Sequence, residues 1–178
     1  PSTKAIGFFK IKSEGAVAAG IRRVEAVCGT AAAELIAEQA EAIMTDLEEA
    51  NAKLEAANDK LKEMKQEPVA VDVDEAIAKQ LSKALDGDDL PTANALLKQY
   101  ASNREAIKQA AVTADKAVKK ASAGAAAEIA SAWYDETLAE LGGDTYAGLL
   151  PGDNPGLLQE ALNVVKARQF SGAVALGL

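Results

Sequence analysis

The sequence contains no histidine, and this absence excludes several kinds of site. Without imidazole there is no histidine acid–base catalyst and no metal site that needs a histidine ligand. Cys28 is the only cysteine, so no disulfide can form within the chain, and a reducing compartment such as the cytoplasm is expected. Aromatic residues make up only 4% of the 178 residues. No apolar run reaches the length of a membrane-spanning helix, so we expect no membrane partner.

The chain is acidic, with a formal net charge of −8, but its basic residues are concentrated near the start. Within residues 1–23, Glu14 is the only acid. The basic residues in that segment are Lys4, Lys10, Lys12, Arg22 and Arg23. A basic segment on an acidic chain indicates contact with an anionic partner, and the alternative is an ordinary solvated surface.

Two long stretches carry apolar residues at alternating steps of four and three, the spacing of a coiled-coil seam. The first stretch contains Ile36, Ala40, Ile43, Leu47, Ala50, Leu54, Ala57, Leu61 and Met64. The second contains Leu97, Tyr100, Arg104, Ile107, Ala111, Ala114, Val118, Ala121 and Ala125. The many alanines predict helices that approach each other closely.

The link between the two stretches decides how they pair. Pro68 should stop the first helix, and a short helix is predicted near 74–86, capped by Asp72 or Asp74. Because the link of about 25 residues leaves room for the chain to reverse, we predict that residues 30–141 form an antiparallel helical hairpin. A parallel coiled coil between two chains is the alternative.

Each end of the chain adds a small α/β piece. Strands are predicted at 5–12 and 21–28, with a short helix or turn at 13–20. After Gly142-Gly143, a β-α-β unit is predicted with strands at 145–150 and 171–178 around a helix capped by Asn154. The expected fold is therefore mainly α, with α/β pieces that look too small to bury cores of their own. We therefore expect each piece to be part of a larger domain.

No stretch carries a convincing catalytic or metal motif. The acidic run at 72–76 lacks the glycine and distal glutamate of a calcium loop, so helix capping explains it better. Cys28 ends a predicted buried strand and is expected to be a small core residue. Trp133 and Tyr134 could stack on a base, but packing against the β-α-β unit is the favoured interpretation.

Arg22 and Arg23 point to opposite faces of one predicted strand. Arg23 can pair with Glu25 on its own face, while Arg22 shares a face with Val24 and Ala26, which we expect to be buried. Arg22 could then reach a phosphate. The alternative is that both arginines only form ion pairs. Together the phosphate-contact candidates are Lys10, Lys12, Arg22 and Arg23.

Residues 6–33, which begin IGFFKIKSEGAVAAGIRRVEAVCG, closely resemble the segment that closes the editing domain in alanyl-tRNA synthetases, whose pattern is near IGxFKIxSExxVAAGxRRIEAVxG. The matching residues are Ile6, Gly7, Phe9, Lys10, Ile11, Ser13, Glu14, Val17, Ala18, Ala19, Gly20, Arg22, Arg23, Glu25, Ala26, Val27 and Gly29. A helical segment follows in that family, and residues 142–178 resemble, more weakly, the start of its C-terminal domain.

The resemblance implies three parts: the end of an editing-type domain at 1–29, a helical region at 30–141, and an incomplete C-terminal domain at 142–178. In that family the editing zinc is held by an HxxxH and a CxxxH pair, and ATP and alanine bind in a separate domain. All of these lie upstream of the matching segment.

The resemblance therefore implies a parent that charges tRNA with alanine and edits mischarged tRNA, using ATP, Mg and Zn. The piece itself is expected to hold no cofactor and to be inactive. Expected partners are tRNA, bound weakly, and the rest of the synthetase, with a homodimer left open. The alternative is a structural coiled-coil module that oligomerises.

Overall fold

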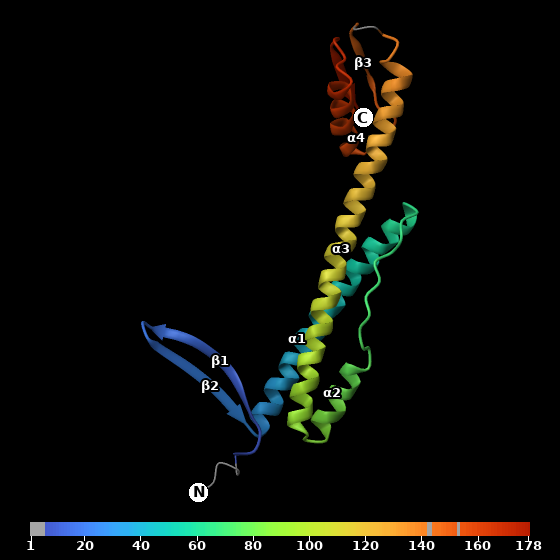
Figure 1. Ribbon diagram of the computed structural model, residues 1–178. Coiled ribbons are helices and arrows are strands. Elements are labelled where there is room, and N and C mark those ends of the chain that lie inside the picture. The colour runs from blue at the N-terminus through green and yellow to red at the C-terminus, as the bar shows by residue number, and fades with distance from the viewer. Residues whose placement is uncertain (1–5, 142–143, 153) are drawn as a thin grey trace. The chain divides into compact units, whose positions relative to one another are not determined.

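The computed structural model describes residues 6–141, 144–152 and 154–178. The elements follow in the order β1 (Phe9–Ala18), β2 (Ile21–Cys28), α1 (Thr30–Glu63), α2 (Ile77–Asp86), α3 (Leu90–Thr137), β3 (Tyr146–Leu149), α4 (Pro155–Ala167) and β4 (Val174–Gly177) (Figure 1). The chain is mainly helical with a strand pair toward each end, which confirms the predicted fold class. Gly142-Gly143, the predicted end of the second long helix, lies outside the described residues.

The chain forms two compact units, which are described separately. Unit 1 contains residues 1–56 and 69–112, and unit 2 contains residues 57–68 and 113–178. Both long helices contribute to both units, because α1 and α3 each continue past the boundary.

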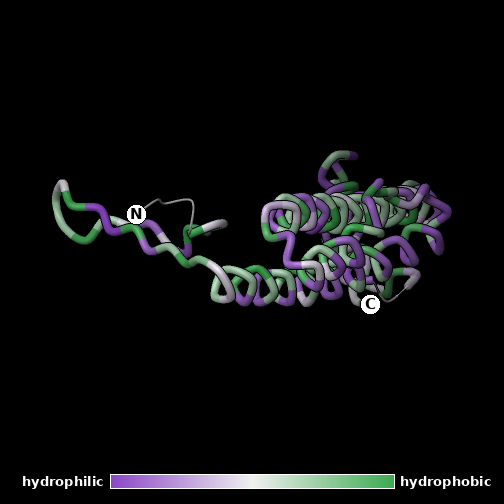
Figure 2. Tube along the Cα trace, turned by 90° about the horizontal axis from the view of Figure 1, so that it is seen from below, coloured by the Kyte–Doolittle hydropathy of each residue, from purple (hydrophilic) through white to green (hydrophobic). Residues whose placement is uncertain are grey.

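Unit 1 opens with an antiparallel hairpin of β1 and β2. The predicted helix or turn at 13–20 is wrong, because Ser13 to Ala18 continue β1 and pair with β2 as far as Ile21. Pairing with a neighbouring strand satisfies the backbone of these small residues and overrides their weak local preference. The turn follows at Ala19 and Gly20, where Gly20 has a φ of 77° that suits glycine. Figure 2 shows hydrophobic and hydrophilic stretches alternating along this hairpin.

Helices α1 and α3 run side by side in the same direction within unit 1, so the predicted antiparallel arrangement is wrong (Figure 1). Gln39 of α1 shares a groove with Lys98 of α3. Further along both helices, Asp46 pairs with Arg104 and Lys108. Moving forward along α1 therefore means moving forward along α3, which only parallel helices allow.

The long link explains why the helices are parallel. Residues 66–74 have no regular structure, and the carbonyl of Asp74 accepts a hydrogen bond from the Asn103 side chain at 2.9 Å. An extended segment of this length covers roughly 30 Å, at about 3.3 Å per residue. That carries the chain back along α1 to where α2 and α3 begin. An antiparallel pair would have needed only a short loop.

The predicted seams are buried along most of their length, which confirms the periodicity. In unit 1 the buried seam residues of α1 are Ile36, Ile43, Leu47, Ala50 and Leu54. Those of α3 in the same unit are Leu97, Tyr100, Ile107 and Ala111. Arg104 is half-buried at a seam position. Burying each large aliphatic side chain contributes about 1.5–3 kcal/mol, so this seam is the main source of stability in the unit.

Helix α2 buries Ile77 and Leu81. The Asp74 carboxylate accepts a hydrogen bond from the backbone N–H of Ala76 at 2.9 Å, so it closes the turn just before the helix. Asp74 therefore does not cap the helix itself, because Ala76 occupies the capping position. Asp89, by contrast, caps α3 by accepting from the N–H of Thr92 at 3.2 Å.

The core of unit 2 joins the last part of α3 to the β-α-β unit. Strands β3 and β4 pair in parallel, and α4 connects them, with Asn154 at its cap and Pro155 in its first turn. These features confirm the predicted β-α-β unit. The buried core residues are Ala126, Ala130, Trp133, Tyr134, Leu138, Leu150, Leu157 and Ala161. Trp133 meets Tyr146 edge-on, and Tyr134 meets Phe170 edge-on, so both aromatic side chains pack as favoured and are not open stacking platforms.

Candidate nucleic-acid interface

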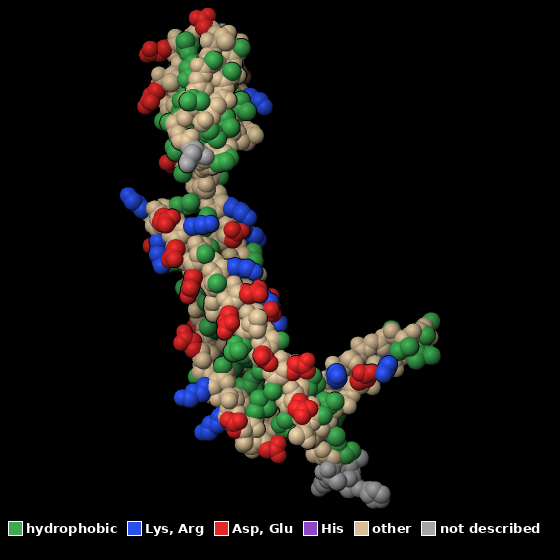
Figure 3. All heavy atoms as spheres, turned by 180° about the vertical axis from the view of Figure 1, so that it is seen from behind, with side chains coloured by type: hydrophobic (Ala, Val, Ile, Leu, Met, Phe, Trp, Pro, Cys, Tyr) green, Lys and Arg blue, Asp and Glu red, His purple; other side chains and the backbone are tan. Residues whose placement is uncertain are grey.

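The two arginines of the hairpin are both paired with carboxylates of the same hairpin. Arg23 pairs with Glu25 at 2.5 Å, as predicted. Arg22 pairs across the strands with Glu14 at 2.7 Å. Both guanidinium groups remain exposed to solvent, and Figure 3 shows basic and acidic side chains next to each other on the hairpin. Phosphate contact by either arginine stays a prediction, but the arrangement observed is the ion-pairing alternative.

The face that Arg22 shares with Val24 and Ala26 is not buried. Val24 is 55% exposed, and Phe9 and Ile11 on the same face of the hairpin are 60% and 53% exposed. Cys28 is exposed as well, so the prediction that it is a core residue is wrong. The physical reason is that the hairpin is a single layer of two strands. Within the described chain, no other element covers this face.

The four candidate residues do not form one site. Lys10 lies opposite Val27 at the base of the hairpin, and Lys12 falls at an irregularity between Ile11 and Ser13 that matches a β-bulge. Arg22 lies opposite Ala16, about 20 Å from Lys10 at the spacing of extended strands. The structure therefore separates the lysines from the arginines.

Lys10 turns toward the helices of unit 1. Its ammonium group donates a hydrogen bond to the side-chain oxygen of Asn94 on α3 at 2.6 Å. It also lines a groove of about 360 Å³, which we call the basic groove. The polar lining residues are Lys10, Gln39, Lys98 and Arg104, and the apolar ones are Ala42, Ile43, Leu97 and Ala101.

The cations of the basic groove are only partly neutralised. Partial burial and the charge of Lys98 lower the pKa of Lys10 below its ordinary value of 10.5. In the part of the chain that the structure describes, neither Lys10 nor Lys98 has a carboxylate partner. The groove therefore keeps an excess of positive charge on an acidic molecule.

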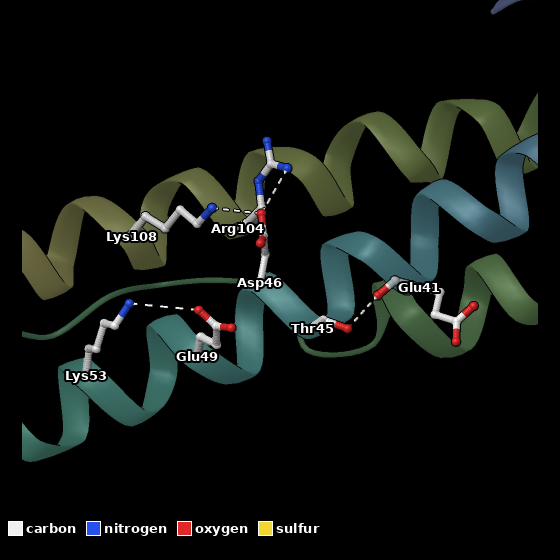
Figure 4. A network of polar contacts seen from close by, with 7 residues as sticks. All are labelled: Glu41, Thr45, Asp46, Glu49, Lys53, Arg104 and Lys108. Atoms are coloured by element: carbon white, nitrogen blue, oxygen red, sulfur yellow. Dashed lines mark hydrogen bonds and ion pairs between the residues drawn. The ribbon is translucent and has the colours of Figure 1, made fainter.

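Asp46 contacts Arg104, one of the cations of this groove, and Figure 4 shows how it bridges the two long helices. It accepts a hydrogen bond from Lys108 at 2.7 Å and lies 3.5 Å from Nη1 of Arg104. The hydrogen bond from Lys108 lowers the pKa of Asp46, and the charges of Lys108 and Arg104 add to this effect. At 3.5 Å the contact with Arg104 is long, and Nε of Arg104 is buried without a partner.

Sequence reasoning found Lys10 but missed the residues of α3 that complete the groove. One signal was present, because Arg104 interrupts a seam made otherwise of apolar residues and Tyr100. A charged residue at such a position is expected to point sideways and find a polar partner. The role of Lys98 could not be found from periodicity, because it depends on the parallel alignment of the helices.

The described residues contain neither a candidate metal site nor a candidate membrane-spanning helix. They contain no group of three His, Cys, Asp or Glu side chains that could hold a metal ion. In the same residues, no helix has the length and apolar character needed to cross a membrane.

Comparison with known proteins finds that the chain is similar to alanine–tRNA ligases. It is 40% identical over 177 residues, 98% of its length, to the alanine–tRNA ligase of Akkermansia muciniphila. Shorter stretches are 63% identical over 43 residues to that of Herpetosiphon aurantiacus, and 43% identical over 74 residues to that of Geobacillus kaustophilus. The chain matches a segment of alanine–tRNA ligase.

The match covers only part of these relatives. The chain spans 18% of the Akkermansia alanine–tRNA ligase, and the aligned stretches cover 5% and 8% of the Herpetosiphon and Geobacillus enzymes. No protein-family model and no solved structure matches it. The likeness is therefore to one stretch of the ligase, most of which lies outside the alignment.

Proposed function

We propose that the chain is a non-catalytic segment of an alanine–tRNA ligase that connects the editing domain to the C-terminal tRNA-binding domain. The observation that carries this proposal is the match to one ligase along 98% of the chain. Its parent would charge tRNA with alanine in the cytoplasm, using ATP and Mg, and would edit mischarged tRNA at a zinc site.

The architecture supports a connecting role. Each end of the chain carries a strand pair, and long helices lie between them in the sequence. The hairpin exposes an apolar face, and a two-stranded hairpin is at best marginally stable by itself. These features suit a segment whose ends are completed by neighbouring domains.

The sequence lacks the histidines that the zinc site of that family's editing domain would use. It has no histidine for a zinc ligand or a general base. We therefore expect the purified chain to show neither ATP-dependent alanylation of tRNA nor hydrolysis of seryl-tRNA. Both reactions would be followed with labelled amino acid, with the whole ligase as the positive control.

The connecting role needs its own test in the whole ligase. Replacing the stretch that corresponds to residues 30–137 with a short flexible linker should leave alanine activation by ATP–pyrophosphate exchange unchanged. It should slow hydrolysis of mischarged tRNA, because the domains at either end lose their fixed spacing. Unchanged editing after this replacement, or turnover by the isolated chain, would contradict the proposal.

A further inference from the structure

The basic groove of unit 1 combines three features that suit a phosphate ester. It brings Lys10 of β1 together with Lys98 and Arg104 of α3. Its floor is apolar, with Ile43 and Leu97 among the lining residues. Its volume of about 360 Å³ falls within the range of pockets that hold small ligands.

The charges of this groove are available to a ligand. Lys10 donates only to a neutral amide oxygen, that of Asn94, and Lys98 has no carboxylate partner among the described residues. Arg104 is held by one long contact to Asp46, so its guanidinium can turn toward an anion. Two ammonium groups that repel each other are stabilised when an anion binds between them.

The residue types favour phosphate over other anions. Lysines supply point charges to phosphate oxygens, and an arginine fork can contact two of them at once. The side-chain amide of Gln39 adds a neutral donor at the groove. The apolar floor can pack against the sugar that carries the phosphate, which a free inorganic ion would not use.

We propose that the basic groove, formed by Lys10, Gln39, Lys98 and Arg104 between β1, α1 and α3, binds the phosphate backbone of RNA, with its three cations contacting neighbouring phosphates. The choice of RNA rests on the proposed function, because a ligase segment acts beside its tRNA. The site lies where the base of the hairpin meets α1 and α3, and it does not use the arginine pair of the hairpin.

The test compares tRNA binding by the 178-residue chain with binding by two charge variants of α3. Lys98→Gln removes a groove cation, and Lys116→Gln removes an exposed cation from the same helix outside the groove. Loss of one phosphate contact should weaken binding roughly tenfold at 0.05 M salt and reduce the slope of log K against log salt by about 0.7–0.9. Lys98→Arg should retain most of the affinity, and Lys116→Gln should change it less than twofold.

A second measurement separates RNA from free phosphate. The side-chain amide of Gln39 should shift in ¹H–¹⁵N spectra when tRNA is added, and should not shift in Lys98→Gln. Inorganic phosphate at the same phosphate concentration should move it far less. If inorganic phosphate alone saturates the shift, free phosphate is the ligand and the RNA assignment is wrong.

Two further outcomes would overturn the groove proposal without touching the proposed function. One is an equal loss of affinity in Lys98→Gln and Lys116→Gln, which would indicate diffuse charge attraction. The other is no tRNA binding by the chain even at 0.05 M salt. The proposed function would fail by a different route, through catalytic turnover of the chain or unchanged editing after linker replacement.

Discussion

At the scale of single residues, three helices end in the same unusual way. Lys65, Asp88 and Gln169 each adopt a left-handed backbone, with φ between 53° and 56°, just after α1, α2 and α4. In α1 the N–H of Gln66 bonds the carbonyl of Leu61 at 2.8 Å, and that of Lys65 bonds Lys62 at 2.9 Å. This is the Schellman motif, with a lysine where glycine is usual. The helix therefore ends at Glu63 through this motif, and the prediction that Pro68 stops it is wrong.

Replacing Lys65 with glycine should stabilise unit 2. A side chain in the left-handed region costs about 1–2 kcal/mol, and part of the gain is lost to the greater freedom of glycine in the unfolded chain. We expect Lys65→Gly to raise the free energy of unfolding by about 0.5–1 kcal/mol in urea titrations followed by circular dichroism. Lys65→Ala is the control, because it removes the same side chain but keeps the strain. Equal stability of the two variants would show that the motif stores no strain at this position.

At the scale of elements, the sequence predicted which faces are buried but not how they align. Spacings of four and three residues are set by the helix itself, so they identified Leu47, Ile107 and their neighbours as core residues. The relative direction of two helices depends on the path of the link, and the same seam suits either direction. Residues 13–18 were misassigned for a similar reason, because their strand exists only through pairing with β2.

The parallel alignment predicts a specific pH-dependent coupling between Asp46 and Lys108. The pKa of Asp46 is lower in the folded chain than its ordinary value of 3.8, so its ion pair stabilises the fold above that value. This stabilisation is lost as the pH falls through the lowered pKa. A double-mutant cycle of Asp46→Asn and Lys108→Met should therefore show favourable coupling at pH 7 that weakens as the pH is lowered below 3.8.

Salt provides the control for this coupling. Both side chains are more than 40% exposed, so the coupling at pH 7 should weaken at 1 M salt, where charges are screened within about 3 Å. A cycle of Asp46→Asn with Lys119→Met serves as the matched negative, since Lys119 pairs with Asp115 on its own helix. Coupling of Asp46 to Lys119 as strong as to Lys108 would contradict the observed alignment.

At the scale of the whole molecule, the balance of charge limits what the chain can bind. The net charge is −8, and Figure 3 shows acidic side chains distributed along the long helices. Sequence reasoning placed the phosphate contacts in the basic start of the chain. The structure pairs two of those four residues with carboxylates, and it brings Lys10 to Lys98 and Arg104, which lie 88 and 94 residues later in the chain. Such a cluster could not be predicted, because it depends on tertiary alignment.

The chain should consequently bind tRNA weakly and with a strong dependence on salt. The groove offers three cations, and each phosphate contact contributes about 0.7–0.9 to the slope of log K against log salt, so the expected slope is roughly −2 to −3. Because the rest of the molecule repels RNA, the dissociation constant at physiological salt should fall in the non-specific range of about 10⁻⁴–10⁻⁶ M. Fluorescence anisotropy of labelled tRNA at 0.05 and 0.2 M salt measures both quantities. Sub-micromolar affinity that persists at 0.2 M salt would mean that the chain is a tRNA-binding module in its own right, and the connecting role would then be secondary.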